Sequence, residues 1–215
     1  MNSPEALCHP CMRTLGNNDA SRCLSCGLGF NASPGASAVC GQCLRDPPAF
    51  DDTTVVTDYA APIDALVQDL KFRARLPLAR MFGHLLIHAA SPSLQQADVL
   101  LPVPLSQHRL EQRGFNQALE IARPLARAWK MPLSLGGCVR TKDTSPQAEL
   151  PLSARRVNMR GAFAVRDRKA IENRHVLVID DVMTTGHTLR ELAACLKRHG
   201  AARVSNLVLA RTPTR

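Results

Sequence analysis

Apolar and polar positions recur along this chain with two spacings. Four stretches place apolar residues at the spacing of an amphipathic helix, over residues 64–72, 78–89, 116–129 and 188–199. Four others are short apolar runs typical of buried strands, at residues 98–103, 136–141, 175–179 and 203–210. Because strands and helices alternate, the expected fold class is α/β with a mostly parallel sheet.

The first 50 residues depart from this pattern. They are rich in Gly, Ser, Asn, Pro and Cys and contain no long apolar run. Such a segment cannot bury a core of its own, so a cross-link has to hold it together. We therefore predict a small Cys-rich module over residues 1–50 and an α/β domain over residues 51–215, which suits a chain of 215 residues.

Residues 175–200 combine a strand, two acids, a turn and a helix. The carboxyl end of a parallel strand is where open α/β sheets bind ligands. The residues that follow this strand are Asp180 and Asp181, then Thr184, Thr185, Gly186, His187 and Thr188. A glycine before a helix N-terminus lets backbone amides approach a phosphate, and the threonines add hydroxyl donors. Because carboxylates repel phosphate, we expect the two acids to contact a sugar diol and Mg²⁺.

Two other phosphate-binding motifs are missing from the sequence. No G-x-G-x-x-G follows a predicted strand, and G-x-x-x-x-G-K-[ST] does not occur, which disfavours a dinucleotide fold and a P-loop. An ordinary strand–turn–helix with surface acids and a threonine cap is the structural alternative. The complete string of strand, two acids and T-T-G-x-T is more specific than a lone T-T-G.

A second candidate for anion binding follows the predicted strand at 98–103. Arg109 and Arg113 are four residues apart, so they share one face if this stretch is helical, and Gly114 follows directly. Two arginines there would clamp a diphosphate through forked hydrogen bonds, whereas the alternative is solvated arginines at a helix start. The polar residues 141–160 predict a long loop that closes over the site as a lid.

Residues 176–189, VLVIDDVMTTGHTL, resemble the phosphoribosyl-diphosphate-binding motif of type I phosphoribosyltransferases. The resemblance implies that phosphoribosyl diphosphate binds with Mg²⁺, with Asp180 and Asp181 at the ribose hydroxyls and residues 184–188 around the 5-phosphate. His187 takes a slot that is often smaller in that family. Thr184 stands where purine-specific members often carry Asp, which argues against purine salvage.

Three further motifs extend the resemblance over nearly the whole chain. They are P-x-P-x-x-x-x-R-x-x-x-R-G-F-N-Q from residue 102, R-x-x-x-T-x-x-Q from residue 140, and N-x-x-G-A-F from residue 158. Together with the Cys-rich start, they resemble the ComF family of competence-associated proteins. That resemblance implies a role in DNA uptake during natural transformation, with single-stranded DNA and a helicase-like translocase as partners.

Six cysteines form three C-x₂-C pairs near the N-terminus, a spacing typical of metal ligands. We favour a zinc-ribbon-like module over residues 1–50, with a structural Zn²⁺ site of four thiolates at Cys23, Cys26, Cys40 and Cys43, because a glycine follows one cysteine in each pair and allows a tight turn. Cys8 and Cys11 are further candidates, with His9 or in exchange with another pair. The alternative is six reduced cysteines without metal, since disulfides are disfavoured in a reducing cytosol.

The formal net charge of +9 suits anionic partners, or it reflects a solvated basic surface. The sequence starts without a basic stretch followed by an apolar run, and no apolar run is long enough to cross a bilayer. We therefore expect a cytoplasmic protein without membrane insertion. No general base or acceptor-binding residue is evident, so the catalytic residue is unassigned. Two functions stay open: phosphoribosyl transfer, or a non-catalytic factor that binds single-stranded DNA or a partner and keeps the phosphoribosyl site as a sensor or relic.

Overall fold

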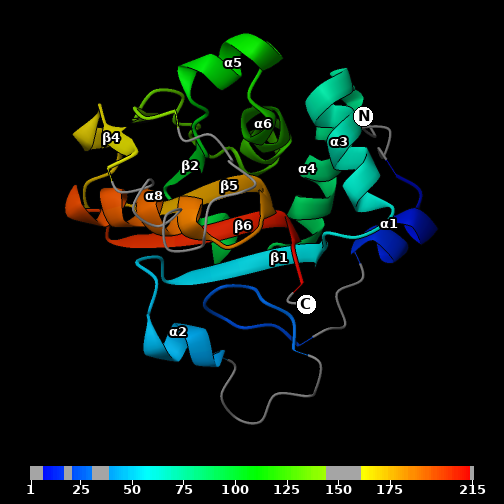
Figure 1. The fold of residues 1–215 in the computed structure, drawn as a ribbon, viewed down its shortest axis with the longest axis horizontal. Coiled ribbons are helices and arrows are strands. Elements are labelled where there is room, and N and C mark those ends of the chain that lie inside the picture. The colour runs from blue at the N-terminus through cyan, green and yellow to red at the C-terminus, as the bar shows by residue number, and fades with distance from the viewer. Residues whose placement is uncertain (1–6, 17–20, 31–38, 144–160, 214–215) are drawn as a thin grey trace.

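The computed structural model describes residues 7–16, 21–30, 39–143 and 161–213. In this part of the chain a parallel sheet with strand order β1-β6-β5-β2 is covered by helices on both faces (Figure 1). Its strands are β1 (Asp52–Asp58), β2 (Val99–Pro102), β5 (His175–Met183) and β6 (Arg203–Arg211). An antiparallel hairpin adds β3 (Cys138–Arg140) and β4 (Phe163–Val165). The predicted α/β class with a parallel sheet is confirmed.

The helices agree with the apolar periodicity wherever the predicted stretch was long. In chain order they are α1 (His9–Gly16), α2 (Gly41–Arg45), α3 (Ile63–Arg73), α4 (Pro77–Ala89), α5 (Gln107–Arg113), α6 (Gln117–Trp129) and α8 (His187–Arg198), with 3-10 turns η1 (Leu94–Gln96) and η2 (Arg168–Ala170). All four predicted helices are confirmed. Residues 144–160 of the predicted lid lie outside the described part of the chain.

The apolar run of strand β5 does not alternate with polar residues, because both faces of this strand are covered. Val176 and Val178 belong to a buried cluster that includes residues of α8, while Leu177 and Ile179 belong to a second cluster formed with α4 and α6. Successive side chains of a strand point to opposite faces, so both faces of a covered parallel strand must be apolar.

Helix α6 continues through Pro124, although a proline inside a helix commonly causes a kink or a break. The reason lies in the neighbouring helix α4, where Gly83 faces the proline. A Cβ atom at Gly83 would lie 2.8 Å from the Pro124 Cγ and 2.9 Å from the Ile121 carbonyl oxygen. The missing side chain therefore lets α4 pack closely against α6 at the turn that the proline occupies.

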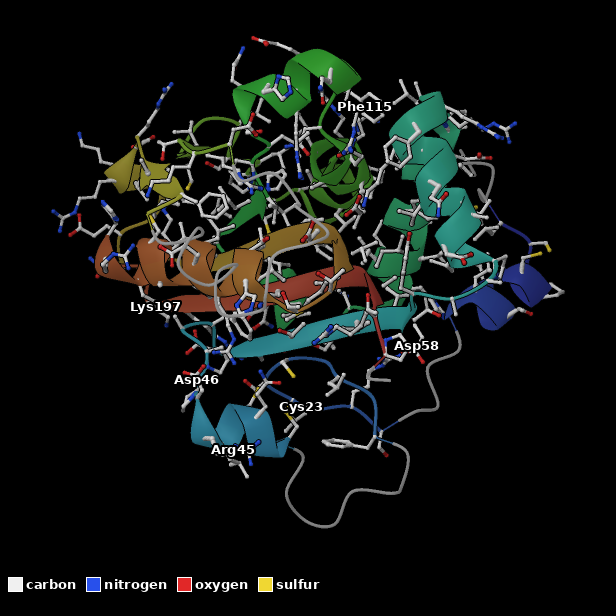
Figure 2. All side chains as sticks on the ribbon, in the orientation of Figure 1. Cys23, Arg45, Asp46, Asp58, Phe115 and Lys197 are labelled. Atoms are coloured by element: carbon white, nitrogen blue, oxygen red, sulfur yellow. The ribbon has the colours of Figure 1, made fainter. Side chains whose placement is uncertain are left out.

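The Cys-rich segment packs directly on the sheet. Cys23 lies beside β1, across the sheet from Phe115 (Figure 2). Gly27 has a φ of 68°, and a Cβ atom there would lie 2.3 Å from a methyl group of Val55 in β1. The backbone amide of Thr53 donates to the Leu24 carbonyl at 3.1 Å. The module and the sheet share one buried cluster, and a domain boundary near residue 50 stays a prediction.

Candidate functional site

A charged pocket opens where β2 and β5 end, at the edge where parallel sheets bind ligands. Its cavity measures about 160 Å³. The charged side chains that line it are Lys71, Arg109, Arg113, Arg140, Asp180 and Asp181, and Asn116 and Thr188 also line it. The structure thus brings together both predicted acids, both predicted arginines and one threonine of the predicted phosphate-binding turn.

Asp180 and Asp181 belong to strand β5 itself, which runs to Met183 rather than ending at Ile179 as the apolar run indicated. Because successive side chains of a strand point to opposite faces of the sheet, the side chains of the two acids leave β5 on opposite faces. Asp181 is only 6% exposed, and its Oδ2 accepts an ion pair from the Lys71 Nζ of α3 at 2.8 Å. Its Oδ1 accepts from the Val182 amide at 2.7 Å. Asp181 is therefore held by the protein on both oxygens.

Asp180 has a different environment from its neighbour. Its side chain is half-buried, and its Oδ1 accepts from the Asp181 amide at 2.9 Å. Burial, together with the charge of Asp181, raises the pKa of Asp180 to about 7 against the opposing effect of Lys71. A carboxyl group with this pKa is partly protonated at neutral pH. A bound cation would favour its ionised form, and a sugar hydroxyl could exchange hydrogen bonds with either form.

The arginines face the acids from two elements. Helix α5 carries Arg109 and Arg113, which confirms that these two residues share a helix, and β3 carries Arg140. Burial lowers the pKa of Arg113 and of Arg140, and the charge of Arg109 adds to the effect on both. Like charges collected in a partly buried pocket indicate a site for an anion, because an anion offsets both the burial and the repulsion.

The predicted phosphate-binding turn, residues 184–188, lies beside the charged pocket. Thr184 and Thr185 are exposed, and Gly186 is buried with a φ of 79°, which a glycine adopts without strain. Helix α8 begins directly after Gly186, at His187. Among the residues of this turn, Thr188 lines the charged pocket. We refer to residues 184–188 as the phosphate loop.

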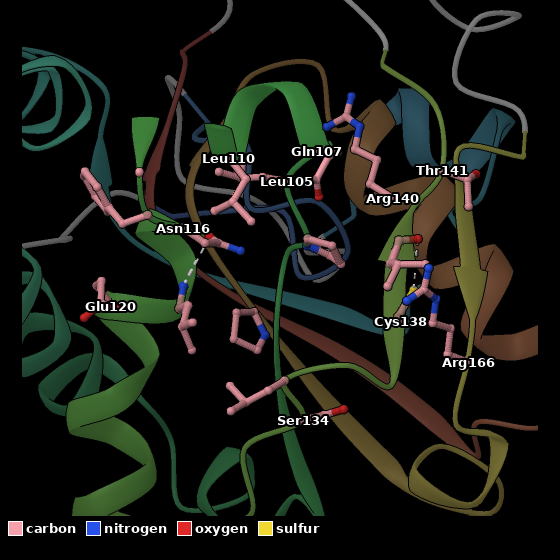
Figure 3. A pocket seen from close by; sticks show the side chains of 17 residues that line it. Leu105, Gln107, Leu110, Asn116, Glu120, Ser134, Cys138, Arg140, Thr141 and Arg166 are labelled. Carbon is pink, nitrogen blue, oxygen red and sulfur yellow. Dashed lines mark hydrogen bonds between the residues drawn. The ribbon is translucent and has the colours of Figure 1, made fainter. Parts of the chain in front are cut away.

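A second and larger cavity of about 810 Å³ adjoins the charged pocket (Figure 3). The two cavities share Leu105, Asn116 and Arg140 in their walls. Gly114, which we grouped with the diphosphate arginines, lines this larger cavity rather than the charged pocket. Apolar side chains form much of the wall, including Leu110 and Leu135.

Four buried cysteines form a site that suits a tetrahedral metal. The sulfur atoms of Cys23, Cys26, Cys40 and Cys43 all lie within 4.8 Å of one another, and those of Cys26 and Cys40 are 3.8 Å apart. Four thiolates at about 2.3 Å from one Zn²⁺ would lie roughly 3.8 Å from each other. The Cys23 sulfur also accepts from the Cys40 amide at 3.2 Å, which stabilises a thiolate. These residues fit Zn²⁺, and we call them the four-cysteine site.

Cys8 and Cys11 are not part of this group. Both are exposed thiols at the start of α1, and no described His, Asp or Glu completes a cluster with them. Metal binding at this pair stays a prediction. Among the described residues, no helix is both long enough and apolar enough to span a bilayer.

Two residues that shape the site belong to no motif that the sequence displays. Lys71 reaches Asp181 from a surface helix, where a lysine at a polar position carries no distinguishing signal. Arg211 lies at the end of β6, 7% exposed, where it donates to backbone carbonyls around the phosphate loop. The one sign of a buried role for Arg211 in the sequence is its place as a charged residue at the end of a long apolar strand.

Several known proteins are similar in sequence to most of this chain. The family model described as "Phosphoribosyl transferase domain" matches residues 114–215. "DNA utilization protein YhgH" of Escherichia coli O157:H7 is 36% identical over 211 residues, which cover 96% of this chain and 90% of the relative. "Competence protein F" of Haemophilus influenzae is 32% identical, covering 80% of this chain and 78% of the relative.

A more distant relative extends the same assignment. "Competence protein ComFC" of Bacillus subtilis is 29% identical over 97% of this chain and 85% of its own length. The matches that cover 96% and 97% of this chain span the four-cysteine segment as well as the charged pocket. The chain therefore belongs to the ComF family of competence-related proteins and carries a phosphoribosyltransferase domain.

Proposed function

We propose that the charged pocket and the phosphate loop bind phosphoribosyl diphosphate together with Mg²⁺. The observation that carries the proposal is the meeting of Asp180 and Asp181 with Arg109 and Arg113 at the carboxyl end of β5. A ligand with a diol, a diphosphate and a phosphate monoester satisfies each of these groups in turn. The acids contact the ribose hydroxyls, the arginines the diphosphate, and the phosphate loop the 5-phosphate.

The acids differ in the roles that we assign to them. Asp181 is already held by Lys71, so we assign it a fixed position beside the ribose. Asp180 has the raised pKa and gains most from a nearby cation, so we assign Mg²⁺ to its side of the pocket. Bound Mg²⁺ would supply charge neutralisation on the diphosphate. Arg109, Arg113 and Arg140 would add to this by stabilising negative charge on a departing diphosphate.

We assign the second substrate of a transfer reaction to the larger cavity. Its volume of about 810 Å³ falls in the range of small-molecule sites. Because it shares Leu105 and Asn116 with the charged pocket, a molecule there lies next to the assigned ribose position. Replacing Leu110 by Trp should block an acceptor in this cavity while phosphoribosyl diphosphate still binds.

Calorimetry with phosphoribosyl diphosphate and Mg²⁺ tests the proposed ligand. The Asp180→Ala/Asp181→Ala variant should lose binding, since both carboxylates are gone. The matched control is Asp51→Ala/Asp52→Ala, a second adjacent acidic pair that contacts Lys197 and Arg203 at the other end of the sheet. The control variant should bind normally. Unchanged binding by the pocket variant would show that the site is wrongly placed.

A second function deserves a separate test because two relatives are named for DNA utilization and competence, and because this chain carries a net charge of +9. In this alternative the protein is a cytoplasmic factor that binds single-stranded DNA or a helicase-like partner, and the phosphoribosyl site serves as a sensor. Diphosphate release with any acceptor from a panel of bases and amines would favour the enzyme. Binding of single-stranded DNA that weakens steeply with salt, without turnover, would favour the alternative.

A further inference from the structure

We propose that the four-cysteine site controls the phosphate loop, so that metal loading sets the affinity for a phosphate monoester. The ligand named here rests on the proposed function, whereas the contacts between the two sites do not. Two arginines connect the Cys-rich segment to the two ends of the phosphate loop. Each connection joins residues more than a hundred positions apart in the sequence.

The first connection is Arg211, the last residue of β6. Its Nε donates to the Cys26 carbonyl at 3.3 Å, and its Nη1 donates to the Met183 carbonyl at 3.1 Å and to the Thr184 carbonyl. One guanidinium therefore spans a metal-ligand turn and the first residue of the phosphate loop. Because a buried charge is costly unless it is fully hydrogen-bonded, these acceptors and the guanidinium fix each other's positions.

The second connection is Arg190, in the first turn of α8. Its Nη2 donates to the Asp46 carbonyl at 2.9 Å, and its Nη1 lies 3.4 Å from the Asp46 Oδ2. Asp46 ends helix α2, which starts directly after Cys40 and contains Cys43. A movement of this short helix therefore reaches the helical end of the phosphate loop. The loop between the two connections contains Thr184 and Thr185, which are both exposed.

Metal binding would hold both connections more firmly in place. Four thiolates around one divalent cation fix the turns at Cys26 and Cys43 and leave a net negative charge beside Arg211. The guanidinium is then held between this charge and the carbonyls of the phosphate loop. A loop whose amides must converge on a small anion loses affinity when its ends are free to shift, because ordering the loop then opposes binding.

Calorimetry with ribose 5-phosphate, which needs no diphosphate and no Mg²⁺, measures this coupling on the full chain. The wild type should bind about tenfold more tightly with zinc than after metal removal, within the usual range for coupled sites. Arg211→Gln should keep its zinc, bind several-fold more weakly than the zinc-loaded wild type, and lose clearly less than about tenfold on stripping, because only the Arg190 connection then remains. Arg211→Lys, which keeps the charge but not the fork, should be intermediate. Arg203→Gln, at the other end of β6, is the matched control and should behave as wild type.

A measurement without ligand keeps this proposal separate from the proposed function. If zinc-loaded wild type binds neither ribose 5-phosphate nor phosphoribosyl diphosphate, the proposed function fails, and amide hydrogen exchange over residues 183–189 still decides the coupling. Exchange there should accelerate in stripped wild type and in zinc-loaded Arg211→Gln. If stripping unfolds the chain, the two zinc-loaded proteins alone are compared. Unchanged exchange in zinc-loaded Arg211→Gln would overturn the coupling. So would affinity losses from stripping and from substitution that are independent of each other, so that their fold-changes multiply.

Discussion

Replacing Lys71 by Met should destabilise the folded chain by leaving Asp181 buried without its cation. The Lys71 Nζ lies 2.8 Å from the carboxylate, whose side chain is only 9% exposed, while the lysine side chain is 22% exposed. Breaking a fully buried pair costs about 3–5 kcal/mol. Asp181 keeps its bond from the Val182 amide and the lysine is not fully buried, so we expect about 2–3 kcal/mol. In a chain of this size that loss lowers the melting temperature by about 4–12 °C.

The assay is urea unfolding of Lys71→Met, Asp181→Asn and the double variant. If the ion pair is the cause, the double variant should be more stable than Lys71→Met, because no unpaired charge remains. Lys197→Met is the matched control: its Nζ lies at the same distance from Asp51, but that carboxylate is 42% exposed, so the cost should stay below about 1 kcal/mol. Equal losses at Lys71 and Lys197, or additive effects in the double variant, would refute this account of Asp181.

Three more predictions concern individual residues. Because burial raises the pKa of Asp180 to about 7, the folded chain binds this proton more tightly than the unfolded chain, and the stability should fall as pH rises from about 4 to about 7. Urea unfolding at several pH values should show that stability depends less on pH in Asp180→Asn than in the wild type. An unchanged dependence would mean that another titratable group causes it. Gly186→Ala places a side chain at a φ of 79° and 2.5 Å from the Met183 Cε, so ribose 5-phosphate binding should weaken and the melting temperature should fall by a few degrees for about 1–2 kcal/mol of strain. Calorimetry that matches wild type would contradict this. Cys40→Ser should reduce zinc from about one ion per chain to near zero, whereas Cys11→Ser should leave it unchanged, as elemental analysis would report.

The sequence predicted the fold well where one periodicity persisted over several turns. Helices α4 and α6 and strand β6 agree with the apolar pattern because each buries a continuous apolar face. Strand β1 was missed because its sequence, DTTVVTD, gives too short an apolar run. Strand β5 was predicted to end at Ile179, because two acids look like the start of a loop. In the structure the strand continues, since Asp181 has a cation to pair with.

The candidate site was predictable only where residues act close together in sequence. The acids, the phosphate loop and the arginine pair each form a local motif, and the structure collects members of all three in one place. Lys71 and Arg211 belong to no motif, because their partners lie on other elements and are brought near only by the sheet topology. The arginine contacts between the four-cysteine site and the phosphate loop also join distant elements, so no local motif predicts them.

The alternation of side chains along β5 also determines which genetic changes this segment can accept. Substitutions at Asp180 or Asp181 alter one partner at a time and leave the rest of the strand in place. The insertion or deletion of a single codon before Asp180 would instead exchange the faces of both acids and of every later side chain in the strand. Lys71 would then face the wrong residue. Length variation among relatives should therefore be absent from residues 176–183 and should concentrate in connecting segments.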